Sequence, residues 1–566
     1  VAAYGVIMYA AFLFVAVFVG YAVGSAPIVS FHYGARNHAE VHNLYQKSLR
    51  LIAVVAVSMT AVSMVLIPYV ARIFVGYDAQ LLALTSRAFR LYALSFLIMG
   101  FNVYASSFFT ALGDGVTSAL ISFLRTLLFQ LAALLLLPAM ASLIYGEWMV
   151  LGVFLLTAAV SAGIGYALHT IKARSKVFYM REGFAATSLC WVFISVMGAV
   201  PFVLTGCIPN PVDALFETVS GFTTTGASIL PAVEGLPNGI LFWRSFTHWI
   251  GGMGVLVFLL SLLPLTGGSH VNLMKAESPG PQVDKLVPKV QSTAKILYGI
   301  YFGLTVIEFV FLLFGGMPVF EALLTSFGTA GTGGFGFRND SFASMSPYVQ
   351  WVVTIFMILF GVNFNAYFLL LMRRFRRAAA SEEVRAYFVI IGVAVVIITA
   401  NIYSMYNGLG EALRHAAFQV GSIITTTGFS SCDFDLWPTL SKEILVMLMF
   451  VGACAGSTGG GIKVSRFLLL GKTLGKELKQ ALHPQVVAPV RMDGKLVNHE
   501  TIRTTNVFLA AYIFIFAASF FLISLDGFDM VTNFTAIAAT LNNIGPGLAQ
   551  VGPVSYTHLR AHETLM

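Results

Sequence analysis

Twelve apolar stretches, each close to the length that crosses a bilayer, dominate this sequence. They lie near residues 3–23, 50–75, 88–112, 115–140, 147–169, 183–204, 239–264, 294–315, 348–372, 386–404, 442–470 and 504–524. A spanning helix needs about 20 mostly apolar residues, because its backbone polar groups find no water in the bilayer and must bond within the helix. The chain is therefore predicted to be an all-α polytopic membrane protein.

The composition excludes a water-soluble fold for the chain as a whole. Of its 566 residues, 58% are hydrophobic and 10% are charged, whereas soluble domains carry about 25% charged residues. This balance argues against a soluble enzyme and against a nucleic-acid-binding protein, and no motif in the sequence suggests catalysis. The four cysteines lie far apart in the sequence, so they predict neither a disulfide framework nor a metal site.

From about residue 183, a long span, a shorter half-polar helix and a Thr/Gly cluster follow one another four times, and a second long span follows each of the first three clusters. The clusters read GFTTTGAS at 221–228, GTGGFGF at 331–337, TTTGFSS at 425–431 and NNIGPGL at 542–548. A repeat of roughly 95 to 115 residues defines an architecture rather than a local motif. The sequence therefore predicts four pseudo-repeats of span, pore helix and span around one pore.

The positions of the basic residues indicate which connections lie on the cytoplasmic side of the membrane. No Lys or Arg lies between Arg181 and Arg244, around the first cluster, or between Arg503 and Arg560, around the fourth. The connections between repeats hold the basic residues Lys275, Lys285, Lys289, Lys295, Arg373, Arg374, Arg376, Arg377, Arg385, Lys472, Lys476, Lys479, Arg491 and Lys495. Because basic loops stay in the cytoplasm, the clusters are predicted to enter the membrane from outside.

A Thr/Gly loop at the C-terminal end of a short helix suits a dehydrated cation. The helix end carries about half a negative charge, glycine admits left-handed backbone, and carbonyl oxygens can replace a hydration shell. The alternative is that Gly and Thr only help the spans to pack. Four clusters in register with the repeat and the charge pattern argue against that alternative. Acidic residues at the entry ends of the short helices are predicted to form an electronegative outer mouth: Asp213, Glu217, Glu321, Glu411, Asp526 and Asp529.

Residues 134–553 resemble the TrkH-like potassium uptake subunits of the Trk/Ktr/HKT superfamily. The matching segments include DALFETVSGFTTTGASIL at 213–230, FWRSFTHWIGGMGVLVF at 242–258, HAAFQVGSIITTTGF at 415–429 and ATLNNIGPGL at 539–548. The resemblance implies a potassium filter formed by Thr224, Thr225, Gly226, Ala227, Thr332, Gly333, Gly334, Phe335, Thr426, Thr427, Gly428, Phe429, Asn543, Ile544, Gly545 and Pro546. In that family a glycine at the key filter position of every repeat accompanies preference for potassium, so potassium is the implied ion.

The segment GACAGSTGGGIK at 452–463 places five glycines inside a predicted span. Each mid-helix glycine costs about 1 kcal/mol relative to alanine, so the helix is predicted to break just below the filter. The alternative is a tightly packed small-residue interface. The resemblance implies a gate loop formed by Gly456, Ser457, Thr458, Gly459, Gly460, Gly461 and Lys463. The Lys463 side chain either repels cations at the closed gate or snorkels to the cytoplasmic face, and snorkelling is favoured.

Four polar residues within predicted spans are weighed against structural roles. For His248 a packing or hydrogen-bonding role is favoured over a proton relay, and Asn363 and Asn365 are expected to bond across helices rather than to bind ions. A carboxylate inside a span is costly and often functional. Glu308 is therefore left open between a functional role and a buried hydrogen-bonding partner.

The resemblance also implies the setting in which such a chain works. It implies a multi-pass protein of the bacterial cytoplasmic (inner) membrane, embedded in the lipid bilayer and paired as a homodimer. It implies a cytosolic, TrkA-like regulatory subunit that binds nucleotide and meets the basic connections. No cofactor is expected in this chain itself, potassium being its substrate, and no nucleic acid is expected as a partner.

Residues 1–133 resemble the later lobe of MATE-family multidrug and toxin extrusion transporters instead. The resemblance rests on GSAPIVSFHYGARN at 24–37 and RAFRLYALSFLIMGFNVYASSFFTALGDG at 87–115. It adds about four N-terminal spans and makes a cation-coupled multidrug antiporter the alternative function. The two resemblances meet in the leucine-rich LLLLPAM at 134–140. The chain is therefore predicted to be a chimera, made either by sequence joining or by natural fusion.

The last residues form a third segment. Residues 554–566, VSYTHLRAHETLM, resemble translated sequencing adapter, so this tail is predicted to be non-native. The TrkH-like resemblance implies that the second span of the fourth repeat is absent before the tail. A non-functional chimera, unable to rescue potassium-limited growth, is therefore a third possibility.

Overall fold

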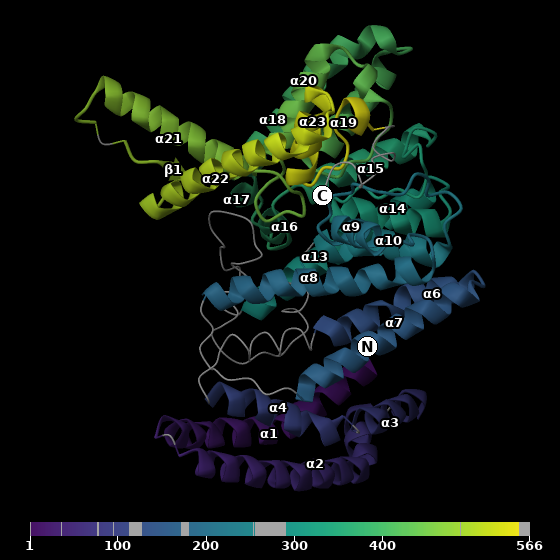
Figure 1. The fold of residues 1–566 in the computed structure, drawn as a ribbon, viewed down its shortest axis with the longest axis vertical. Coiled ribbons are helices and arrows are strands. Elements are labelled where there is room, and N and C mark those ends of the chain that lie inside the picture. Colours follow the sequence, from purple (N-terminus) through teal and green to yellow (C-terminus); the bar gives the residue numbers. More distant parts are fainter. Residues whose placement is uncertain are drawn as a thin grey trace. The chain divides into compact units, whose positions relative to one another are not determined.

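The computed structural model describes residues 2–35, 37–75, 79–93, 95–111, 127–170, 180–252, 254, 290–486 and 488–553. The regular secondary structure of the described residues is helical apart from one antiparallel pair of strands, β1 (Arg491–Met492) and β2 (Lys495–Leu496). It divides into two compact units (Figure 1), an N-terminal unit of Val1–Phe129 with Ala162–Cys190 and a C-terminal unit of Gln130–Ser161 with Trp191–Met566. The predicted non-native tail lies outside the described residues.

The N-terminal unit contains the helices α1 (Ala2–Gly34), α2 (His38–Val75), α3 (Ala79–Ala93) and α4 (Phe96–Ala111). Its core is formed where Phe18 of α1 and Ala56 of α2 pack with Tyr104 and Phe108 of α4. The span predicted near 88–112 covers the end of α3, at Ala93, and α4, which begins at Phe96. The predicted span near 115–140 begins in residues outside the described part of the chain.

The C-terminal unit carries the four Thr/Gly clusters. Its helices are α6 (Leu136–Ile144), α9 (Pro211–Phe222), α10 (Asn238–Gly252), α13 (Val290–Phe314), α14 (Val319–Gly331), α15 (Pro347–Phe360), α16 (Phe364–Leu371), α17 (Phe375–Ala379), α18 (Glu382–Ile402), α19 (Leu409–Ile424), α20 (Thr439–Val451), α21 (Val464–Leu482), α22 (His499–Ile523) and α23 (Met530–Leu541). Two further helices, α7 (Trp148–Thr170) and α8 (Met180–Leu204), contribute residues to both units. Short 3-10 turns lie at Tyr403–Met405, Phe434–Leu436, Ser524–Asp526 and Ala549–Val551.

The order of these helices repeats along the chain. The sets α8–α9–α10, α13–α14–α15 and α18–α19–α20 follow one another, and α22–α23 begins a fourth. The middle helix of each set has 12 to 16 residues, which is too short to cross a bilayer. Each of these short helices, α9, α14, α19 and α23, leads directly into one Thr/Gly cluster.

Seven helices in the described part of the chain are long and apolar enough to span a membrane. They are Val15–Gly34, His38–Ile67, Leu127–Ile144, Trp148–Tyr166, Ile296–Phe314, Glu382–Met405 and His499–Asp526. The pair α15 and α16 would make an eighth, but it bends by 92°. The span predicted near 348–372 is therefore made of two helices with a sharp break between them. The break is fixed locally by Asn363, whose side-chain oxygen accepts a hydrogen bond from the Asn365 N–H and caps α16.

The break predicted from the glycine run is present. Helix α20 ends at Val451 and α21 begins at Val464, and the residues between them form a loop that we call loop 452–463. The backbone is left-handed at Gly452, Gly456, Gly461 and Lys463. The two limbs of the loop touch at its neck, since a Cβ on Gly461 would lie 2.6 Å from the Cα of Gly452. Only glycine fits this close approach.

Candidate ion-binding site

The four Thr/Gly clusters share one unusual backbone conformation. The residue at the start of each segment has a left-handed φ: 59° at Thr224, 51° at Thr332, 59° at Thr426 and 58° at Asn543. Two residues later each segment has a glycine with φ of 78° (Gly226), 79° (Gly334), 82° (Gly428) or 95° (Gly545). Left-handed backbone strains residues other than glycine, so it persists only where the surroundings impose it. The same strain at four equivalent positions marks one recurring structure.

These four segments form a closed ring. A Cβ on Gly226 would lie 2.1 Å from the Gly333 carbonyl oxygen, and one on Gly334 would lie 2.1 Å from that of Thr427. The same contact links the third segment to the fourth, because a Cβ on Gly428 would lie 2.0 Å from the Ile544 carbonyl oxygen. The ring closes where Gly545 faces the Thr225 oxygen, at 3.3 Å. Each segment thus packs its glycine against the second residue of the next segment.

The ring concentrates carbonyl oxygens at the ends of four short helices. The negative C-terminal ends of α9, α14, α19 and α23 all lead into it, and such ends attract cations. A hydrogen bond of 2.9 Å from the Thr225 hydroxyl to Asn543 Oδ1 joins the first segment to the fourth. All sixteen residues predicted for a filter lie in these four segments. Chemically, the arrangement can replace the water around a monovalent cation by backbone oxygens.

An ion pair beside the ring corrects one sequence prediction. Glu217, on α9, was assigned to an acidic outer mouth, but its side chain is fully buried and lies 2.5 Å from the Nε of Arg244 on α10. Its carboxylate also accepts hydrogen bonds from the Ser228 hydroxyl at 3.1 Å and from the Ile229 N–H at 3.0 Å. Glu217 therefore fixes the chain that follows the first ring segment instead of facing solvent.

Arg244 extends this contact to the second ring segment. Its Nη1 donates to the Gly336 carbonyl at 2.9 Å, and its guanidinium lies 3.8 Å from the centre of the Phe335 ring. His248, one turn further along α10, stacks on the same ring at 4.1 Å, and its Nδ1 faces the Phe335 N–H at 3.4 Å. The packing role predicted for His248 is confirmed. Arg244 was missed, although an arginine inside a predicted span was a visible signal.

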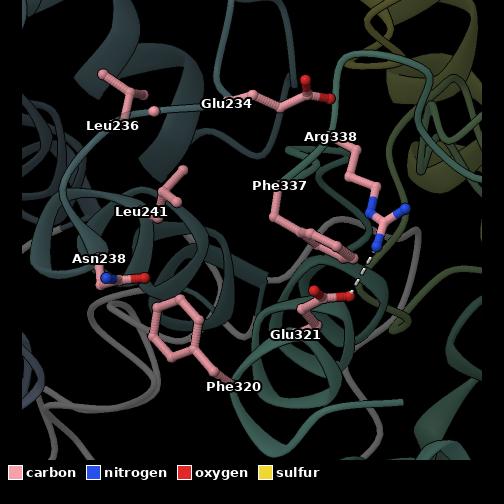
Figure 2. Close-up of a pocket in the computed structure, with 9 residues that line it drawn as sticks. Glu234, Leu236, Asn238, Leu241, Phe320, Glu321, Phe337 and Arg338 are labelled. Carbon is pink, nitrogen blue, oxygen red and sulfur yellow. Dashed lines mark ion pairs between the residues drawn. The ribbon is translucent and has the colours of Figure 1, made fainter. Parts of the chain in front are cut away.

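Among the remaining acidic residues, Glu321 and Glu411 form ion pairs and Asp529 caps a helix. Glu321 pairs with Arg338 at 3.5 Å on the wall of a pocket of about 450 Å³, which Figure 2 shows together with Glu234 and Phe320. Asp529 caps α23 by accepting hydrogen bonds from Val531 and Thr532. The hydrogen bonds from Thr532 lower the pKa of Asp529 and keep it ionised. Within the described residues, no group of three acidic, His or Cys side chains could hold a metal ion.

Loop 452–463 lies directly against the ring. The Gly460 N–H donates to the Thr426 hydroxyl at 2.6 Å, and a Cβ on Gly460 would lie 2.4 Å from the Asn542 carbonyl oxygen. A Cβ on Gly459 would lie 2.8 Å from the Thr425 oxygen. The loop backbone therefore contacts the Thr426 hydroxyl of the third ring segment and the residues just before the third and fourth segments, and every residue predicted for a gate lies in the loop.

The break between α15 and α16 receives this loop. The Cys454 N–H donates to the Gly361 carbonyl at 3.0 Å, the Phe364 N–H donates to the Gly456 carbonyl at 2.9 Å, and the Thr458 hydroxyl donates to the Phe360 carbonyl at 3.3 Å. A helix end leaves backbone groups without intrahelical partners. Here the loop of the third repeat supplies those partners to the second repeat. Residue identity gives no sign of this relation, because 348–372 forms one largely apolar stretch in the sequence.

Two ionisable residues that were placed inside predicted spans differ in their surroundings. Lys463 is buried, and its ammonium group turns back to donate to the Gly459 carbonyl. The snorkelling position favoured for Lys463 is therefore wrong. Glu308, on α13, is fully buried. In the described part of the chain, no donor lies at hydrogen-bonding distance and angle from either of its carboxylate oxygens.

Comparison with known proteins identifies the larger part of the chain. Residues 151–559 match the family model TrkH, described as "Cation transport protein". The chain belongs to the TrkH family. It is 36% identical over 425 residues to "Trk system potassium uptake protein TrkH" of Salmonella typhimurium, covering 74% of this chain and 88% of that relative. It is 33% identical over 426 residues to "Trk system potassium uptake protein TrkG" of Escherichia coli, covering 74% and 87%.

A solved structure supports the same fold. The crystal structure of the potassium transporter TrkH from Vibrio parahaemolyticus aligns with a TM-score of 0.68 and 30% identity, over 79% of this chain and 95% of that one. Residues 1–134 match a different family model, MatE. The chain therefore joins a MATE-like segment to a TrkH-family body, as predicted. The TrkH match begins at 151 and extends to 559, and the boundaries at 133 and 553 stay predictions.

Proposed function

We propose that residues 134–553 form a potassium-translocating domain that lets potassium cross the bacterial cytoplasmic (inner) membrane down its electrochemical gradient. The observation that carries this proposal is the closed ring of four glycine–carbonyl contacts at the ends of four short helices. The relatives in the TrkH family are named as potassium uptake proteins, which favours potassium as the ion. The filter would comprise the four segments 224–227, 332–335, 426–429 and 543–546.

The selectivity of this filter would depend on backbone geometry. A potassium ion entering from outside exchanges its water for carbonyl oxygens held at fixed separation, and the four negative helix ends offset the cost of dehydration. Left-handed residues at Thr224, Thr332, Thr426 and Asn543 turn the chain so that successive carbonyls can face one axis. The reaction is ion movement without bond chemistry, so the domain is not an enzyme and requires no cofactor of its own.

Uptake of radioactive rubidium tests this function. We expect the full-length chain in proteoliposomes to take up rubidium along a potassium gradient, with excess potassium competing about tenfold better than sodium. The measurement is tracer accumulation with either competing salt. Equal competition by sodium contradicts the proposal. Export of a cationic dye without rubidium uptake indicates the alternative MATE-type antiport, and no transport of either kind indicates a non-functional chimera.

Loop 452–463 would act as the gate. Its Gly460 N–H donates to the Thr426 hydroxyl and its Lys463 ammonium turns back to the Gly459 carbonyl, so the loop would lie in the path of an ion leaving the filter. Shortening 456–461 is expected to raise rubidium uptake several-fold, because the obstruction is removed. The control is the same shortening in a Gly428→Ala chain, in which uptake should stay low if the additional ions pass through the ring. Unchanged uptake in the shortened chain contradicts the gate assignment.

The cytoplasmic connections would form the regulatory surface. In the described part of the chain, α21 and the β1–β2 hairpin carry Lys472, Lys476, Lys479, Arg491 and Lys495. We propose that a homodimer presents these basic elements to a cytosolic, TrkA-like subunit, which would hold the nucleotide. Co-purification of the chain with such a subunit, weakened by salt, is the expected sign of an interface of this kind.

A further inference from the structure

One buried carboxylate holds loop 452–463 at both of its ends. Glu383 lies in the first turn of α18 and is 5% exposed. Its Oε1 accepts hydrogen bonds from the Ala455 N–H at 2.6 Å and from the Ser465 N–H at 3.2 Å. Ala455 lies near the start of the loop, and Ser465 lies just beyond its end. A single oxygen atom therefore connects backbone positions ten residues apart, from a helix that belongs to neither limb.

The chemistry of this contact suits a carboxylate. Ser465 lies in the first turn of α21, where backbone N–H groups have no intrahelical acceptor and the helix dipole favours negative charge. Hydrogen bonds to an ionised acceptor are also about twice as strong as bonds between neutral groups.

A third hydrogen bond connects Glu383 to the break between α15 and α16, into which the loop packs. Its Oε2 accepts a hydrogen bond of 3.4 Å from the Asn363 side chain, in the break between α15 and α16. Asn363 also lies against the loop, since a Cβ on Gly456 would lie 3.3 Å from the Asn363 side-chain oxygen. The break that receives the loop and the two ends of the loop therefore meet at the same carboxylate.

We propose that Glu383 is the positioning residue of loop 452–463 and that loss of its hydrogen bonds releases the loop from the ring. Both limbs bind one oxygen, so neither limb can move away without breaking one of the two bonds. Gly452 and Gly461, at the neck of the loop, have left-handed backbone, and the released loop would rotate about these two residues. The effect of release on ion passage rests on the proposed function, whereas the release itself does not.

Cys454 offers a direct test, because its buried thiol lies within the loop and is 0% exposed. In a full-length chain whose other cysteines, Cys190, Cys207 and Cys432, are replaced by alanine, the rate of N-ethylmaleimide addition to Cys454 is measured by mass spectrometry in membranes. We expect Glu383→Ala to raise this rate about tenfold and Glu383→Gln to raise it less, because the amide keeps one acceptor oxygen without the charge. Glu382→Gln, at the adjacent residue that pairs with Lys472, is the matched control and should change the rate less than about twofold.

A second thiol separates local release from unfolding. In chains that retain only Cys432, the same Glu383 substitutions should leave the rate of N-ethylmaleimide addition unchanged. An equal increase in the labelling rates of Cys454 and Cys432 would indicate unfolding and counts against the proposal. Unchanged labelling of Cys454 in both Glu383 variants overturns it. Faster labelling of Cys454 without a change in rubidium uptake supports the positioning role and contradicts the gate role. These measurements therefore distinguish failure of the positioning role of Glu383 from failure of the gate role of loop 452–463.

Discussion

Replacing Gly428 by alanine is expected to lower rubidium uptake about a hundredfold, which is the scale of loss that a misplacement of about 1 Å causes at a preorganised site. The new Cβ would lie 2.0 Å from the Ile544 carbonyl oxygen and 3.1 Å from Pro546, and both of these neighbours belong to the next ring segment. The residue also has φ of 82°, which alanine adopts only with strain. Tracer uptake by the purified variant in proteoliposomes measures the effect.

A second glycine provides the control for this substitution. Gly392 lies within α18, and a Cβ there would meet nothing within 4 Å. Gly392→Ala should keep parental uptake and stabilise the helix by up to about 1 kcal/mol. If Gly428→Ala transports rubidium as well as Gly392→Ala does, the ring is not the path of the ion.

Removing the charge of Glu217 is expected to lower the free energy of unfolding by about 3–5 kcal/mol, as is typical when one member of a buried ion pair is lost. Arg244, whose side chain is 4% exposed, would remain charged and lose its carboxylate partner. The Gly336 carbonyl and the Phe335 ring would not replace that partner, because neither carries a negative charge. Thermal unfolding of Glu217→Gln in detergent measures the loss.

The pair of Glu321 and Arg338 gives a matched comparison in the second repeat. Figure 2 shows this ion pair as a dashed line. Its atoms are 3.5 Å apart, but the Glu321 and Arg338 side chains are 26% and 39% exposed. Glu321→Gln should cost no more than about 1 kcal/mol, because solvent screens an exposed pair. Equal losses from the two substitutions would show that burial does not set the strength of the Glu217–Arg244 pair. The double variant Glu217→Gln/Arg244→Gln should recover part of the loss, since it leaves no buried charge unpaired.

The ring was predictable in location because repetition carries its signal. Four clusters with an equivalent glycine mark Gly226, Gly334, Gly428 and Gly545 in the sequence, and these glycines make the contacts between segments. The break at loop 452–463 was predictable because a run of glycines makes a helix costly. In both cases the physical cause lies in the local sequence, where it can be read directly.

The errors concern features that depend on contacts distant in sequence. The 92° break after Phe360 is stabilised by a loop about a hundred residues later in the chain, so an apolar stretch alone reads as one helix. Glu217 was placed in solvent because its partner Arg244 lies on another helix. Glu383 was not singled out at all. Two of its partners are backbone N–H groups, which leave no mark on residue identity.

The closed ring also limits which substitutions its four segments can accept. In a stack of elements the outermost member can shift without disturbing the rest, but a circle has no outermost member. If one segment moves outward, its glycine leaves the carbonyl of its neighbour, and the gap must be shared around all four contacts. The aperture is therefore a property of the whole circle. A change tolerated in one quarter requires a compensating change in another, so the four quarters cannot diverge independently at these positions.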